Sequence, residues 1–190
     1  MTLLEAIIWI AAFTAAMMAL TSSVLYFYRT SDYTIQQASA ISSAQKGIDT
    51  LMRAVREASY ASNGAYPVVS IATNDFVFYA DIDTDTAIER AHYYLQNNTL
   101  MKGELDPSGD PPVYTGSESA STISQDLRNT TLGVPIFTYY DKNGAQITDY
   151  TRIADVRFVS VLIYVDVDPV KTPTPISLRS SAAMRNLIGH

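Results

Sequence analysis

The first part of the chain is almost uniformly apolar. Residues 6–28 form a run of 23 residues with no charged side chain, no glycine and no proline. At a rise of about 1.5 Å per residue, a helix of this length matches the hydrocarbon core of a bilayer, which is ~30 Å thick. The pattern therefore predicts that residues 1–28 form a transmembrane helix.

After Arg29 the apolar positions lie on one side only. Between Ile35 and Val55 they recur at spacings of three or four, and polar residues fill the positions between them. Asn63-Gly64 and Pro67 then supply a stop signal. The two parts together predict one helix of about sixty residues, far longer than an ordinary domain helix. Its second half, from residue 29 to about 62, is amphipathic, as expected of a helix that lies on a folded domain.

Beyond Pro67 the chain changes to short runs of β-branched and aromatic residues between turn residues. The expected strands are 68–71, 76–79, 91–95, 99–101, 136–140 and 155–167, followed by a final segment at 176–187. Asn97-Asn98 predicts a tight hairpin, and residues 104–121, rich in proline, glycine and serine, predict a long exposed loop. In the 155–167 strand we assign one face to the core beneath the helix (Val159, Val161, Ile163, Val165 and Val167). The predicted fold class is α+β, with one very long N-terminal helix packed on an antiparallel sheet, and residues 29–190 form a single soluble domain.

Composition excludes several classes of function. The net charge is −6, and residues 75–126 hold ten acidic and two basic side chains, so we expect no nucleic-acid partner. The absence of cysteine excludes disulfides, thiolate metal sites and cysteine nucleophiles. Two histidines, His92 and His190, are too few for a histidine-rich metal site. No nucleophile-elbow or phosphate-loop motif is present, so we expect no enzymatic activity.

The N-terminal segment poses two problems. The first basic residue is Arg29, on the C-terminal side of the apolar run, so the positive-inside rule would keep the rest of the chain in the cytoplasm. Glu5 is the second problem, because an unpaired carboxylate deep in a membrane helix costs roughly 2.5–3.5 kcal/mol. The nearest cation is the α-amino group of Met1, on the same chain or on a neighbour. A pair between chains would align the N-terminus of each copy with the next.

The opening Met1-Thr2-Leu3-Leu4-Glu5, followed by a long apolar helix, resembles the mature N-terminus of type IV pilins and the related pseudopilins. The resemblance implies that a prepilin peptidase has removed a basic leader and methylated the new N-terminus. It also implies a filament subunit that assembles through Met1, Thr2, Leu3, Leu4 and Glu5, with Glu5 paired to a neighbouring N-terminus. The implied partners are other pilin-like subunits, an inner-membrane assembly machinery and, before assembly, membrane lipid.

The same resemblance implies a location in the cytoplasmic membrane and then in an extracellular filament or a periplasmic pseudopilus. Residues 137–141 and 184–187 are loosely similar to larger minor pilins and J-type pseudopilins. Thr14 and Ser22 stand where the family often has glycine and proline, so the helix has no strong breaker. The alternative function is a single-pass, membrane-anchored extracytoplasmic binding domain that does not polymerise.

Two further patterns each have two interpretations. Ala11, Ala15 and Ala19 lie at i, i+4 and i+8, which either allows close helix packing or reflects the frequency of alanine in helices. Four acidic residues, Asp81, Asp83, Asp85 and Glu89, either converge on a calcium ion or line the solvated turn of a hairpin. Apart from that calcium ion, no cofactor is expected.

Overall fold

The computed structural model describes residues 2–83, 85, 87–168, 170 and 175–187. Its first element is α1 (Leu3–Glu57), and the chain divides into two compact units, Met1–Ser39 and Ala40–His190. The first unit contains α1 as far as Ser39. The second contains the rest of α1, two antiparallel sheets, the short helix α2 (Asn129–Leu132) and two 3-10 turns, Ile153–Asp155 and Arg185–Leu187.

The long helix is confirmed, and it ends earlier than the sequence pattern predicts. Helix α1 is unbroken from Leu3 to Glu57, whereas the pattern extends it to about residue 62. The next residue, Ala58, forms a β-bridge with Ala80, and the Ser59 N–H donates to the Tyr79 carbonyl at 3.0 Å. Pairing with a strand therefore ends the helix before the Asn63-Gly64 turn is reached.

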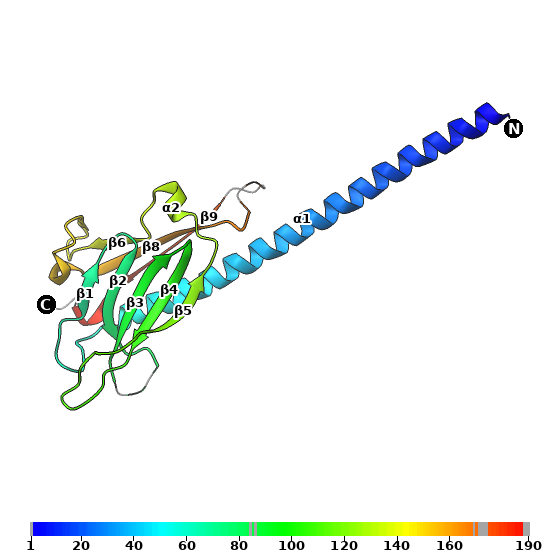
Figure 1. Cartoon of the computed structure of the whole chain (residues 1–190). Helices are drawn as coiled ribbons and strands as arrows, with labels where there is room; N and C mark the ends of the chain where they lie inside the picture. The colour runs from blue at the N-terminus through cyan, green and yellow to red at the C-terminus, as the bar shows by residue number, and fades with distance from the viewer. Residues whose placement is uncertain (1, 84, 86, 169, 171–174, 188–190) are drawn as a thin grey trace. The chain divides into compact units, whose positions relative to one another are not determined.

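The first sheet is a five-stranded antiparallel meander in the order β1-β2-β3-β4-β5 (Figure 1). Its strands are β1 (Val68–Ile71), β2 (Asp75–Ala80), β3 (Glu89–Gln96), β4 (Thr99–Leu105) and β5 (Ser119–Ser124). The β3–β4 hairpin turns at Asn97 and Asn98, whose φ angles are +48° and +61°. Two consecutive positive φ angles are typical of a type I′ turn, so the predicted tight hairpin is confirmed.

The second sheet has four strands in the order β7-β6-β8-β9, all antiparallel. These strands are β6 (Phe137–Tyr140), β7 (Gln146–Ile147), β8 (Phe158–Val165) and β9 (Ile176–Ala183). Hydrogen bonds connect its start to the β1–β2 turn of the first sheet, because the backbone N–H groups of Ile136 and Phe137 both donate to the Thr73 carbonyl, at 3.0 and 2.9 Å.

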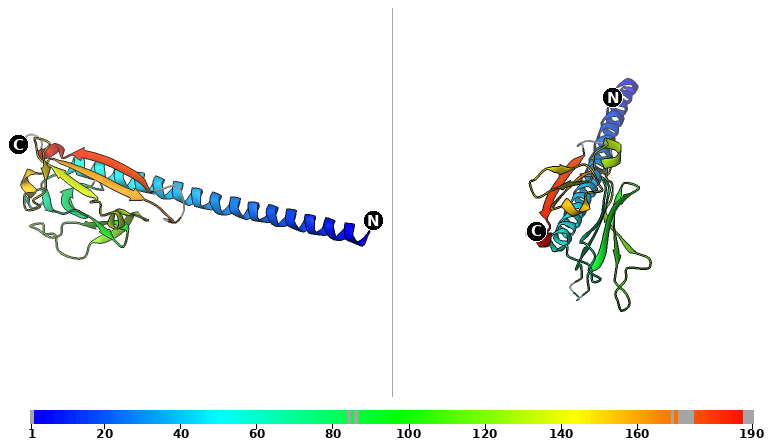
Figure 2. Two further views of the ribbon diagram at one scale, coloured as in Figure 1. Left: turned by 90° about the horizontal axis from the view of Figure 1, so that it is seen from above. Right: turned by 90° about the vertical axis from the view of Figure 1, so that its left-hand side faces the viewer.

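One core is shared by the helix and both sheets (Figure 2). The buried stripe of α1 includes Ile48, Leu51, Met52 and Val55, at the spacing that the amphipathic pattern predicts. Full burial of each such large side chain contributes about 1.5–3 kcal/mol. The four positions assigned to the core face of β8 are all fully buried (Val159, Val161, Ile163 and Val165). Val167 lies beyond the end of β8 and is half-buried, so its assignment to that face was wrong.

Two segment predictions need correction. Residues 104–121 are not one loop, because β4 continues to Leu105 and β5 begins at Ser119. The small polar residues of β5 give a weak strand signal, and the strand is formed by its pairing with β4. The strand expected at 155–167 spans only Phe158–Val165, because Ile153–Asp155 forms a 3-10 turn ahead of it. Pro169 and Pro173, which follow this strand in the sequence, lie outside the described residues.

Candidate functional site

The start of α1 is closed by two reciprocal hydrogen bonds between Thr2 and Glu5. The Thr2 N–H donates to Glu5 Oε2 at 3.2 Å, and the Glu5 N–H donates to Thr2 Oγ1 at 3.4 Å. This capping box occupies two of the backbone donors that the first turn of a helix leaves unpaired. The helix dipole also favours a negative charge at this position. Glu5 therefore stabilises the start of its own helix.

This capping box is not among the features predicted from the sequence, although Thr-x-x-Glu is its signature. Glu5 Oε1 has no hydrogen-bond partner among the described residues, so one carboxylate oxygen remains for a second partner. Met1, whose α-amino group is the predicted cation, lies outside the described residues. Leu3 and Leu4, the other two members of the predicted assembly segment, are exposed.

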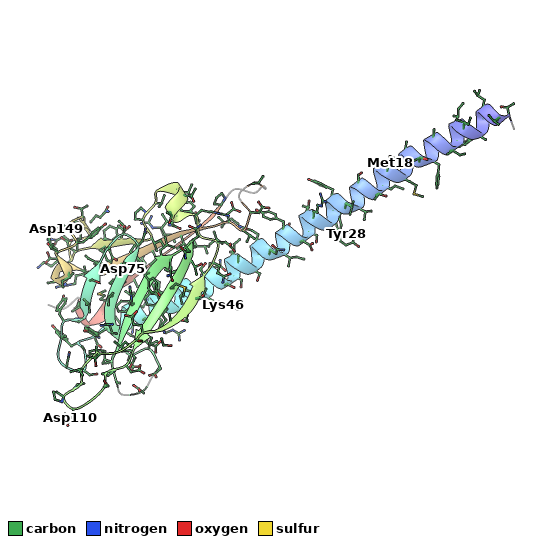
Figure 3. All side chains as sticks on the ribbon, viewed as in Figure 1. Met18, Tyr28, Lys46, Asp75, Asp110 and Asp149 are labelled. Carbon is green, nitrogen blue, oxygen red and sulfur yellow. The ribbon has the colours of Figure 1, made fainter. Side chains whose placement is uncertain are left out.

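The helical segment from Leu3 to Tyr28 presents a continuous apolar surface. Fifteen large apolar side chains are exposed there, including Trp9, Met18 and Tyr28, and Figure 3 shows Met18 and Tyr28 extending from the helix. Among the described residues, α1 is the one helix long and apolar enough to cross a membrane. Tyr26, Phe27 and Tyr28 immediately precede Arg29, a sequence typical of a membrane interface. This surface is compatible with membrane anchoring or with burial against other helices.

Small side chains form a stripe along the same segment. Ala11, Ala15 and Ala19 are all exposed on the helix, where they would allow another helix to approach closely. Helix α1 continues through Thr14, whose hydroxyl donates to the Ile10 carbonyl at 2.7 Å. The side-chain hydroxyl is thus satisfied within its own chain, as an apolar environment requires. Whether the stripe packs against a partner stays a prediction.

Three of the four predicted calcium ligands lie together. Asp81, Asp83 and Glu89 each offer a carboxylate oxygen, and these three atoms are within 4.8 Å of one another. The structure does not bring Asp85 into this group. The physical reason is a local turn, in which Asp85 Oδ1 accepts a hydrogen bond from the Ala87 N–H at 2.6 Å.

The alternative interpretation, a solvated turn, describes only part of the same loop. Asp83 and Asp85 are exposed in the β2–β3 turn, whereas Glu89 begins β3 and is 1% exposed. The Ile82 N–H donates to Glu89 Oε2 at 2.7 Å. Burial raises the pKa of Glu89 above its ordinary value, and the neighbouring charges of Asp83 and Asp85 raise it further, against the lowering effect of this hydrogen bond. Three clustered oxygens suit a hard cation, although acidic clusters are common without one.

The sequence assigns His92 no partner, and the structure places it between two carboxylates on the outer face of the first sheet. Its Nε2 lies 2.8 Å from Asp75 Oδ2, and its Nδ1 lies 2.9 Å from Glu118 Oε2. Arg90 donates to the other oxygen of Glu118 at 3.0 Å. Gly103, opposite His92 on β4, leaves room for this arrangement, because a Cβ there would lie 2.4 Å from Glu118 Oε2.

These contacts set the charge of the network. Burial of the His92 imidazole lowers its pKa, but the hydrogen bonds and charges of Asp75 and Glu118 outweigh burial and raise the pKa above its ordinary value. Burial likewise raises the pKa of Glu118, and His92 and Arg90 reverse that effect and lower it. His92 therefore ties the segment that precedes β5 to strands β2 and β3, and its protonated form adds ion pairs to both carboxylates.

Comparison with protein-family models and with curated proteins found no match to this chain. The architecture itself, a long N-terminal apolar helix packed on antiparallel sheet, is consistent with a pilin-like fold.

Proposed function

We propose that this chain is a structural subunit of a type IV pilus or of a pilus-like (pseudopilus) filament, and that it polymerises through the N-terminal part of α1. The observation that carries the proposal is the segment from Leu3 to Tyr28, a helix whose large apolar side chains are all exposed. Such a surface needs lipid or other apolar helices around it. The opening Thr2-Leu3-Leu4-Glu5 supports the filament over a simple anchor, because the capping box uses only one oxygen of Glu5 and a carboxylate at this depth is costly without a cationic partner.

The assembly mechanism has three steps. The apolar helix first holds the subunit in the cytoplasmic membrane, with the folded unit outside. An assembly machinery in that membrane then transfers the helix into the filament core, where lipid contacts are exchanged for helix contacts. Because burial from water does not drive this exchange, close approach at Ala11, Ala15 and Ala19 supplies the packing that favours it.

Glu5 fixes the axial register in the third step. Its Oε2 remains on the Thr2 N–H, and its Oε1 accepts from the α-amino group of a neighbouring subunit. In a partly screened environment two unit charges about 4 Å apart attract by about 4 kcal/mol. This is comparable to the cost of holding an unpaired carboxylate in an apolar core, roughly 2.5–3.5 kcal/mol. The pair therefore forms with the correctly aligned neighbour and disfavours other registers.

The capping box allows the two roles of Glu5 to be separated by experiment. Glu5→Gln removes the charge but retains an oxygen that caps Thr2, whereas Thr2→Ala removes a capping oxygen and keeps the charge. We expect Glu5→Gln to abolish filaments in the native cell and Thr2→Ala to reduce them only modestly. Thermal unfolding of the folded unit should be unchanged in both, because the core residues all lie between Ala44 and Leu187.

Filaments at normal yield from Glu5→Gln would contradict the register role of this residue. If cross-linking of the unsubstituted chain in native membranes yields only monomers, the chain is instead a membrane-anchored domain that does not polymerise.

A further inference from the structure

The outer face of the second sheet contains a groove of about 490 Å³. Small side chains at Ser160, Ser181 and Ala183 lie beside the larger Tyr140 and Phe158, and this difference in size leaves the hollow. These residues come from β6, β8 and β9, so the groove is built on regular strands and is held by their hydrogen bonds.

One cation lies in this groove. Arg179, on β9, donates through Nε to Ser160 Oγ at 3.3 Å, which holds its guanidinium at the groove. Among the described residues Arg179 has no carboxylate within ion-pair distance, so none of them neutralises its charge. An exposed arginine in the same groove as Tyr140 and Phe158 suits a segment that offers a carboxylate and compact apolar side chains.

Charge is divided unevenly between the two sheets. Residues 75–126, which include β2 to β5, hold ten acidic and two basic side chains, whereas residues 127–190 hold five acidic and seven basic ones. Residues 75–126 therefore carry a net negative charge, and residues 127–190 carry a net positive charge. Two copies attract each other when the first sheet of one faces the second sheet of the next.

A rigid acidic loop connects β4 to β5. Ser108 and Val113 exchange two backbone hydrogen bonds, each 2.9 Å long, which close its tip. Behind the tip, the Tyr114 hydroxyl donates to the Ile88 carbonyl and accepts from the Ser62 N–H at 3.0 Å. Asp110 is exposed at this tip (Figure 3), has no partner among the described residues, and is followed by Pro111 and Pro112. Because the loop is ordered in advance, its docking costs little conformational entropy.

We propose that the groove around Arg179 binds the loop 106–113 of a second copy of this chain, with Asp110 paired to Arg179 and the prolines against Tyr140 and Phe158. The contact joins different surfaces on the two copies, since the loop extends from the first sheet and the groove lies on the second (Figures 1 and 3). A contact of this kind repeats from copy to copy and generates an open filament or a ring. The inference rests on the proposed function and adds a second subunit interface, outside the helix core.

Because the chain has no cysteine, pairs of introduced cysteines report the contact directly. The test pair is Ser108→Cys with Ser181→Cys, one in the loop and one in the groove. The control pair is Ser108→Cys with Thr151→Cys, whose second position is also exposed but lies outside the groove. Each variant is expressed as the full chain in native cells, and its filaments are oxidised mildly.

We expect the test pair to give a ladder of disulfide-linked dimers, trimers and higher species, and the control pair to remain largely monomeric. Normal filaments without a ladder, or an equal ladder from the control, would overturn the inference and leave the proposed function intact. Failure of the unsubstituted chain to form any filament would overturn both.

A charge exchange provides an independent measurement. Arg179→Glu and Asp110→Arg should each lower filament yield about tenfold, because each places like charges opposite one another. The double variant restores the pair and should return the yield to within about twofold of the original chain. If the double variant shows only the sum of the two losses, the residues do not meet.

Discussion

Tyr93 and Tyr139 are both fully buried in the core, yet they differ in what their hydroxyl groups contact. Tyr139 donates to the carbonyl of Ala72 at 2.9 Å, and the carbonyl of Asp75 lies 3.2 Å away. Tyr93 has no hydrogen-bond partner among the protein atoms of the described residues. Burial, and then the charge of Glu104, raise the pKa of Tyr93 far above its ordinary value. Its hydroxyl therefore stays protonated and remains an unpaired donor.

The two Tyr→Phe substitutions should consequently have opposite effects on the free energy of unfolding. A buried hydroxyl without a partner costs about 1–3 kcal/mol, so its removal from Tyr93 should leave stability unchanged or raise it by up to about 1 kcal/mol. Removal of the Tyr139 hydroxyl leaves the Ala72 carbonyl without its donor and should lower stability by about 1–2 kcal/mol. The expected difference of about 2 kcal/mol corresponds to a difference in Tm of about 4–8 °C for a unit of this size.

Near-ultraviolet circular dichroism of the tyrosines in the full chain is a suitable assay during thermal or chemical unfolding. The single tryptophan, Trp9, lies in the exposed apolar helix and does not report on the core. Equal losses of stability in the two variants would refute the assignment of Tyr93 as an unsatisfied donor. A larger loss from Tyr93→Phe would show that its hydroxyl has a partner of its own.

Three further predictions follow from other contacts. Gly47→Ala should lower the free energy of unfolding by about 1–3 kcal/mol, because a Cβ there would lie 2.3 Å from Ile123 Cγ2 and 3.0 Å from the Ile123 carbonyl oxygen. Chemical denaturation measures this loss, and an unchanged midpoint would contradict the close approach of α1 to β5. The folded-state pKa of His92 is raised above its ordinary 6.5, so its ion pairs stabilise fully below pH 6.5, and this contribution is lost as the pH rises through the raised value. Denaturation at several pH values should show this loss in the original chain and not in His92→Gln. If the acidic cluster binds calcium, calcium at a hundred times its Kd should stabilise chelator-treated protein by about 2.7 kcal/mol, and Glu89→Gln should remove this effect. An unchanged Tm on addition of calcium would reject the calcium site.

The fold was predictable wherever the hydrophobic period was long and regular. The stripe that includes Ile48, Leu51 and Val55 predicts a helix with one buried face, and the structure confirms it. The helix end was less predictable, because the bridge from Ala58 to Ala80 involves a residue distant in sequence. Strand β5 shows the same limit, since its serines and threonine have little strand preference and become a strand only by pairing with β4.

The candidate sites were predictable by residue type more than by geometry. The acidic spacing identifies Asp81, Asp83 and Glu89, but it cannot show that Glu89 is buried or that Asp85 caps a local turn. The ion-pair network around His92 joins residues 17 and 26 positions away in the sequence, which no local pattern relates.

The proposed function requires that this chain is a processed filament subunit. The most direct measurement is the intact mass and N-terminal sequence of the chain in filaments sheared from native cells, compared with its open reading frame. The proposal predicts that the chain is present in the filaments, begins at Met1 after loss of a basic leader, and is heavier by one methyl group on that residue. A chain that is absent from the filaments and remains in the membrane without such processing would contradict it.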